Sequence, residues 1–170
     1  MHDNIEKLQR LVILFITILC SFAFAGIASA ETPLEGAWLL VEMQGADGNL
    51  DSDPLGGLMI FTSTHYSIMY AIGEKPRALM DEENPTDEQI INAYESIIAN
   101  SGRYDIEGSE FVTRAYVAKY PNYMDDWPEN VTTFSYSIDG DALTIKADSG
   151  PDAGTTQKYR RVEGSPRPWE

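Results

Sequence analysis

Short runs of alternating apolar and polar residues, separated by turn-forming residues, fill the chain from residue 36 to residue 162. Such alternation predicts β-strands, because successive side chains of a strand point to opposite faces of a sheet. Short strands at regular spacing are typical of an all-β sandwich or barrel. Eight strand-length segments can be counted, at 36–43, 57–62, 65–72, 102–107, 110–118, 131–138, 142–147 and 155–162.

Three connections between these segments are short enough to form hairpins, over 63–64, 108–109 and 139–141. The last of them, Asp139-Gly140-Asp141, is the clearest turn in the chain, because glycine tolerates the positive φ that tight hairpins require. Eight strands are enough to close a barrel whose interior can hold one small ligand. We therefore predict an all-β fold, an eight-stranded antiparallel up-and-down barrel.

The first and last segments carry residues that suit such a closure. Trp38 lies in the first segment, and Tyr159-Arg160-Arg161 lies in the last. In a closed sheet these two strands would be neighbours, and a guanidinium group would lie against the indole face. We predict Trp38 and Arg160 as the structural pair that closes the barrel.

A single amphipathic helix is predicted to interrupt the strands over about 87–100. Thr86 and Gln89 form a capping box, in which each side chain satisfies a backbone N–H near the start of the helix. Five apolar residues then fall on one helical face: Ile90, Ile91, Tyr94, Ile97 and Ile98. Gly102 is expected to stop the helix. The apolar stripe would pack on the barrel wall or cover its mouth as a lid.

The first thirty residues have the features of a signal peptide. Lys7 and Arg10 precede an apolar run over 11–25, and Ala28-Ser29-Ala30 supplies the small residues that signal peptidase needs. Cleavage would leave a barrel domain over 31–170, exported to the periplasm or the extracellular space and not inserted in a membrane. An uncleaved anchor is the alternative, since the run approaches the roughly 18 residues that can span a bilayer.

Charge and cysteine content limit the partners and cofactors of the domain. The chain has a net charge of −15 and one cysteine, Cys20, which lies in the predicted signal peptide. The domain therefore has no disulfide or thiolate metal site, and His65 has no second histidine with which to share a metal. We expect no metal, no cofactor and no nucleic-acid partner. The acidic surface either attracts a cationic protein partner or serves solubility alone.

Five motifs, in this order, make the chain similar to the lipocalin-like domain family of exported bacterial proteins. They are Leu34-Glu35-Gly36-Ala37-Trp38-Leu39-Leu40-Val41, Gly56-Gly57-Leu58-Met59-Ile60-Phe61-Thr62, Ser101-Gly102-Arg103-Tyr104-Asp105-Ile106, Ile138-Asp139-Gly140-Asp141-Ala142-Leu143-Thr144-Ile145 and Tyr159-Arg160-Arg161. Together they cover most of residues 34–163. The resemblance implies a calycin-type β-barrel with a ligand cavity.

Strand tyrosines suggest what such a cavity would bind. A cavity lined by apolar side chains and a few phenol hydroxyls suits a small apolar or aromatic molecule. Alternatively, the barrel is filled by its own side chains. On strand alternation, the predicted ligand-binding residues are Leu40, Ile60, Ile68, Tyr70, Tyr104, Phe134 and Tyr136.

Two other functions stay open. A barrel enzyme of the isomerase or cyclase type would need a carboxylate, such as Glu42 or Asp105, beside a buried tyrosine. An acidic protein-binding module could act through the aromatic loop at 120–128, because exposed loop aromatics are typical of recognition surfaces. Alternatively, Tyr123 and Trp127 of this loop fold back and plug an open end of the barrel. The sequence has no recognised catalytic motif, so we assign no catalytic residues and favour a binding protein.

Overall fold

The computed structural model describes residues 32–126 and 128–162. The predicted signal peptide at 1–30 and its cleavage site lie outside the described residues, as do Trp127 and the C-terminal segment 163–170. None of the helices in the described part of the chain is long and apolar enough to cross a membrane.

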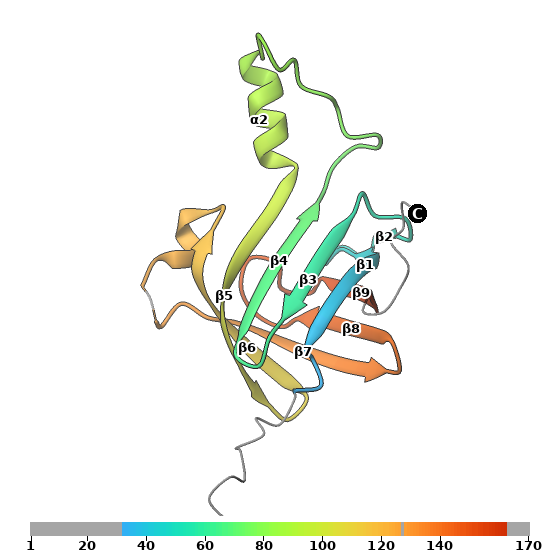
Figure 1. The fold of residues 1–170 in the computed structure, drawn as a ribbon, viewed down its shortest axis with the longest axis vertical. Coiled ribbons are helices and arrows are strands. Elements are labelled where there is room, and N and C mark those ends of the chain that lie inside the picture. Colours follow the sequence, from blue (N-terminus) through green and yellow to red (C-terminus); the bar gives the residue numbers. More distant parts are fainter. Residues whose placement is uncertain (1–31, 127, 163–170) are drawn as a thin grey trace, which may run out of the picture. The chain divides into compact units, whose positions relative to one another are not determined.

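Eight antiparallel strands form a closed ring, which confirms the predicted fold (Figure 1). Each strand pairs with the next along the ring, and the last pairs with the first. In chain order the ring strands are β1 (Gly36–Gln44), β3 (Gly57–Phe61), β4 (His65–Ala71), β5 (Ile97–Glu107), β6 (Glu110–Ala118), β7 (Thr132–Asp139), β8 (Ala142–Ala147) and β9 (Thr156–Arg161). The two-residue strand β2 (Leu50–Asp51) pairs only with the end of β1.

The seam between β1 and β9 closes the ring as expected, but the cation on the indole is Arg161 and not Arg160. The guanidinium carbon of Arg161 lies 4.0 Å from the centre of the Trp38 ring. Register explains the difference, because Arg161 is opposite Trp38 while Arg160 is opposite Leu39 and points outward. Arg161 Nη1 also donates a hydrogen bond to the Glu35 carbonyl at 2.6 Å.

Aromatic side chains from several strands pack with Trp38 in the barrel interior. The Trp38 indole is fully buried, and its Nε1–H donates to the Leu34 carbonyl at 2.8 Å. Phe61 and Phe111 pack edge to face, with ring centres 5.6 Å apart. The Tyr104 hydroxyl donates to the Thr62 carbonyl at 2.7 Å, so its polar end is satisfied while its ring is buried. This part of the barrel interior is a packed core.

Helix α2 (Asp87–Glu95) is five residues shorter than predicted, because Ile97 and Ile98 belong to β5. These two residues pair with Ala71 and Tyr70 on β4, so sheet pairing replaces the last helical turn. The predicted capping box at Thr86 is present. Gly102 does not stop the helix and lies inside β5.

Of the two placements predicted for the helix, packing of its apolar stripe on the barrel wall is wrong. No residue of α2 is buried, and the Ile91 side chain remains 55% exposed. The helix lies beyond the strand ends that it connects (Figure 1), and the apolar stripe is short because Ile97 and Ile98 belong to the sheet. Its main anchor is Tyr94, whose hydroxyl donates to the Lys119 carbonyl at 3.0 Å.

Candidate functional site

A small chamber lies inside the barrel beside the packed core, and core residues such as Tyr66 and Tyr70 form part of its wall. It has a volume of about 30 Å³, which is room for about one or two water molecules. Its lining side chains come from strands β3 to β7, from β9 and from two loops: Met59, Tyr66, Ile68, Tyr70, Ile98, Asn100, Thr113, Tyr123, Thr132, Phe134, Asp152, Thr155 and Gln157. With the core residues around it, this small volume means that side chains of the described part of the chain fill most of the barrel interior, the alternative that the sequence had left open.

The phenols in and beside this chamber are neutral hydrogen-bonding groups. Burial raises the pKa of Tyr66 to about 12, although a hydrogen bond with Thr113 opposes the shift. Burial also raises the pKa of Tyr70 and Tyr159. The Tyr159 hydroxyl donates to Gln157 Oε1 at 2.8 Å. Because removal of a proton would place a charge in a dry interior, these tyrosines stay protonated at neutral pH.

A larger pocket lies at the end of the barrel where β5 and β7 begin, which we call the mouth, and it shares part of its lining with the chamber. It has a volume of about 310 Å³, at the lower end of the range that holds small molecules. Ile98, Thr132, Tyr123 and Asp152 line both spaces, so they form the neck between chamber and mouth. The remaining lining residues of the mouth pocket are Tyr120, Asn122, Asn130 and Pro151.

The neck is held by one hydrogen bond between two loops. The Tyr123 hydroxyl donates to Asp152 Oδ2 at 3.2 Å and joins the short helix η1 (Pro121–Met124) to the loop before β9. Burial and then the nearby Asp152 charge raise the pKa of Tyr123, and the same charge contributes to the raised pKa of Tyr70. The negative potential of Asp152 therefore reaches the chamber.

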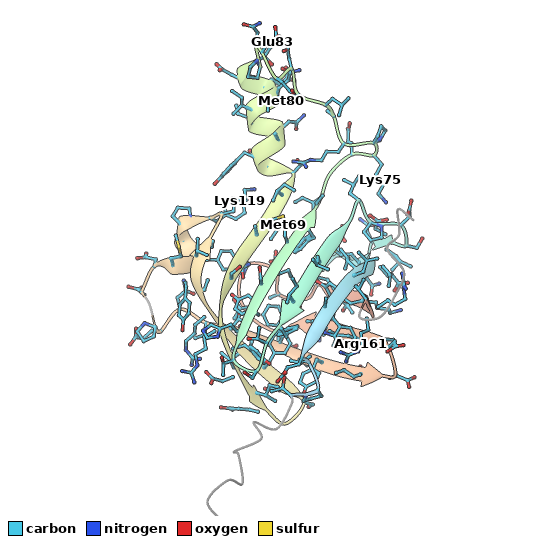
Figure 2. The ribbon with its side chains drawn as sticks, in the orientation of Figure 1. Met69, Lys75, Met80, Glu83, Lys119 and Arg161 are labelled. Atoms are coloured by element: carbon cyan, nitrogen blue, oxygen red, sulfur yellow. The ribbon has the colours of Figure 1, made fainter. Side chains whose placement is uncertain are left out.

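The side chain of Lys119, which is labelled in Figure 2, contacts the rings of Tyr94 and of Tyr120 beside the mouth pocket. The Lys119 ammonium lies 4.3 Å from the centre of the Tyr94 ring and 4.2 Å from that of the Tyr120 ring. It also donates to the Ile97 carbonyl at 2.6 Å and to the Tyr120 hydroxyl at 2.9 Å. These contacts hold Tyr120 in place as one wall of the mouth pocket.

Most of the predicted ligand-binding residues do not line one cavity. Ile68, Tyr70 and Phe134 line the chamber, whereas Leu40 and Tyr104 are buried in the core and do not reach it. Tyr136 packs against the core, and its hydroxyl donates to the Gly108 carbonyl. Ile60 is wrongly placed in the prediction: its side chain is 41% exposed on the outer face, because its neighbours Met59 and Phe61 point inward.

The carboxylates proposed for an enzyme lie away from the chamber. Asp105 pairs with Arg103 and Arg114 at 3.1 and 2.9 Å, and Glu42 pairs with Lys158 at 2.7 Å. His65 is exposed and hydrogen-bonds to Thr64 Oγ1 through Nδ1. Within residues 32–126 and 128–162, no three histidine, cysteine, aspartate or glutamate side chains gather as metal ligands.

Sequence patterns gave no signal for Asp152, which lies in a loop 29 positions from Tyr123. For Tyr123 the signal was its place in the aromatic loop at 120–128, where the sequence left open an outward recognition surface or a fold back onto the open end of the barrel. In the structure the Tyr120 and Tyr123 side chains turn toward the mouth, which disfavours their use as an outward-facing protein-binding surface.

A second pocket, of about 220 Å³, lies between α2 and the loop at 72–80. Its walls are partly charged, and Arg77 anchors the loop there through bonds to the Ser96 hydroxyl and the Ala93 carbonyl. Because this pocket has no connection to the barrel interior through shared lining residues, we consider the mouth pocket the candidate site.

An eight-stranded antiparallel barrel with a chamber opening at one end defines a calycin-type protein. The chain matches the model of the lipocalin-like domain over residues 35–162 and belongs to that family. No match was found among curated proteins.

Two solved structures are similar to the chain. A lipocalin-like protein from Bacteroides uniformis ATCC 8492 is 19% identical, with 76% of this chain and 98% of that chain covered and a TM-score of 0.44. An uncharacterized protein from Bacteroides eggerthii DSM 20697 is 14% identical, with 76% and 99% covered and a TM-score of 0.44.

Proposed function

We propose that this protein is exported and binds a small molecule with an apolar or aromatic body in the mouth pocket. The observation that carries the proposal is a pocket of about 310 Å³ that shares four lining residues with a tyrosine-lined chamber in a lipocalin-like barrel. Ile98, Pro151 and the rings of Tyr120 and Tyr123 supply the apolar walls. A few polar groups beside apolar walls are typical of small-molecule sites.

The chamber determines how such a ligand would sit. Its volume of about 30 Å³ admits only the tip of a molecule or bridging water, so the body remains at the mouth. The Tyr70 phenol and the Asn100 amide can then form hydrogen bonds with a polar group at that tip. In this proposal the ligand lies mainly in the mouth pocket, whereas the sequence predicted a ligand inside the barrel.

Filling the mouth pocket tests this proposal. We expect Ile98→Trp to weaken binding of the neutral fluorescent probe N-phenyl-1-naphthylamine by at least about tenfold, or about 1.4 kcal/mol. The larger indole would occupy the neck, because Ile98 lines both the chamber and the mouth. Ile60→Trp is the matched control, since Ile60 lies on the outer face of β3. Titration of probe fluorescence gives both dissociation constants.

Equal binding of the probe by the two variants would contradict the proposed site. Native mass spectrometry of the protein purified from its own producing cells provides an independent result. A copurified molecule that is absent from Ile98→Trp and present in Ile60→Trp would identify the natural ligand. Failure of the wild-type protein to bind any member of a panel of lipophilic probes would overturn the function itself.

Export is proposed on the signal-peptide features of residues 1–30. We expect the intact mass of the protein from the producing cells to match a chain that begins at Glu31. The Ala30→Asp variant should accumulate at full length, because signal peptidase requires a small residue before the cut. A wild-type protein that retains residues 1–30 would instead support the membrane-anchor alternative.

A further inference from the structure

One charged side chain faces the space in which we propose that the ligand binds. Among the described residues that line the chamber and the mouth pocket, only Asp152 carries a charge. Its carboxylate lies at the neck, where both spaces meet. The acid therefore occupies the position that a ligand's polar group would reach first.

The backbone and one phenol hold this carboxylate in place. The Asp152 carbonyl accepts hydrogen bonds from the Thr155 N–H at 3.0 Å and from the Thr155 hydroxyl at 2.8 Å. The Tyr123 hydroxyl donates to Oδ2. A carboxylate has about four acceptor positions, so one phenol leaves most of them for a ligand.

Nearby cations already have other partners. In the described ranges, each of the six ion pairs joins groups other than Asp152. The Lys119 ammonium beside the mouth pocket is bound to the Ile97 carbonyl and the Tyr120 hydroxyl. Because no lysine or arginine of the described chain neutralises it, the Asp152 charge acts on the pocket itself.

The walls around this charge suit a cation with an apolar body. Tyr120 and Tyr123 present aromatic rings, and ammonium groups are attracted to the faces of such rings. Ile98 and Pro151 complete an apolar surface. The chain's net charge of −15 would also raise the local concentration of cationic ligands and repel anionic ones.

We infer that the mouth pocket binds a cationic amine with an apolar or aromatic body, and that its ammonium group pairs with Asp152 at the neck. This inference rests on the proposed function and specifies its ligand class. An N–H donor on a charged amine forms a shorter and stronger hydrogen bond with a carboxylate than a neutral donor does. The body of the amine would lie between Tyr120, Ile98 and Pro151.

Three probes that share one body and differ in the head group test this inference. They are 4-phenylbutylamine, 4-phenylbutan-1-ol and 4-phenylbutyrate, which at neutral pH carry a positive, a zero and a negative charge. Calorimetric titration of the purified protein should give the tightest binding for the amine. We expect the alcohol to bind about tenfold more weakly, and the carboxylate more weakly still.

A pair of charge-matched variants assigns the preference to one residue. Asp152→Asn keeps the shape of the side chain and removes its charge, so we expect it to lose the tenfold preference for the amine and to bind the alcohol as the wild type does. Asp139→Asn removes the same charge from an exposed hairpin residue at the end of β7, where Asn-Gly is also a favoured turn. This control should keep the preference.

The outcomes separate this inference from the function on which it depends. Wild-type protein that binds the alcohol as tightly as the amine would overturn the inference and leave the pocket in place. If Asp152→Asn still prefers the amine, the inference is also overturned and the pocket stays, because a group other than Asp152 would then cause the preference. Binding of none of the three probes, nor of N-phenyl-1-naphthylamine, would overturn both. If Asp152→Asn does not fold, the test of the inference is the order of the dissociation constants of the three probes for the wild-type protein.

Discussion

Replacement of Trp38 with alanine is expected to lower the free energy of unfolding by about 4–5 kcal/mol. The indole is fully buried among the aromatic side chains of the barrel core. Its removal leaves a cavity in a packed core, and it leaves the Leu34 carbonyl without the hydrogen bond that the indole N–H donates. Because domains of this size are stable by about 5–15 kcal/mol, the variant should be at the edge of folding.

Urea unfolding followed by far-ultraviolet circular dichroism measures this loss without dependence on tryptophan fluorescence. Trp38→Phe keeps a buried ring and loses the N–H, so its cost should be about half that of the alanine variant. A loss below about 1 kcal/mol for Trp38→Ala would show that the barrel does not depend on this packing.

Alanine substitutions of the neighbouring Arg161 and Arg160 form a matched pair that tests the contact between the guanidinium group and the indole. Arg161→Ala removes a guanidinium 4.0 Å from the ring and a hydrogen bond to Glu35, so it should cost about 1–2 kcal/mol. Arg160→Ala removes an outward-pointing side chain and should cost less than about 0.5 kcal/mol. Equal costs would mean that the stacked cation does not stabilise the seam.

The contrast between these arginines shows what the sequence could and could not predict. Strand positions were predictable, because alternation and turn residues act locally, and seven of the eight ring strands lie close to the predicted segments, while β5 begins five residues before its predicted start at 102. The face of a single residue was less certain. Alternation does not show which side chain points into the barrel where neighbouring residues are of the same kind. This is the case for the adjacent Arg160 and Arg161 and for the four apolar residues over 58–61. Ile60 and Arg160 were therefore assigned to the wrong faces.

Long-range pairing explains the other differences. Ile97 and Ile98 fit the apolar stripe of a helix, and as β-branched residues they fit a strand equally well. Pairing with β4 decides between the two, and this partner lies some 27 residues away along the chain. The neck between Tyr123 and Asp152 depends in the same way on contact between two loops. Local patterns cannot predict such contacts, so the site was less predictable than the fold.

Gly102 is the second position at which we expect a large effect. Gly102→Ala should lower the free energy of unfolding by about 3 kcal/mol, because the added Cβ would lie 1.9 Å from the Arg114 carbonyl oxygen and 2.8 Å from the Ala115 Cα. Both atoms belong to the backbone of β6, so the clash with the new Cβ can be removed only if a strand moves. Gly108→Ala is the control: its φ of +66° strains an alanine by about 1–2 kcal/mol, with no atom within 4 Å of the new Cβ. Urea unfolding measures the loss of unfolding free energy in both variants. Equal losses would show that the close contact between β5 and β6 at Gly102 does not cause the effect.

This glycine also connects the fold to the proposed site. The register between β5 and β6 shifts between Ser101 and Gly102, which gives β6 one extra residue and bends the pair of strands. Beyond the bend, β5 directs Ile98 and Asn100 into the chamber, while Tyr104 on the other side belongs to the core. Forcing the strands apart at Gly102 should therefore alter the neck. We expect Gly102→Ala to weaken binding of N-phenyl-1-naphthylamine under conditions in which it remains folded, whereas Gly108→Ala should bind the probe as the wild type does.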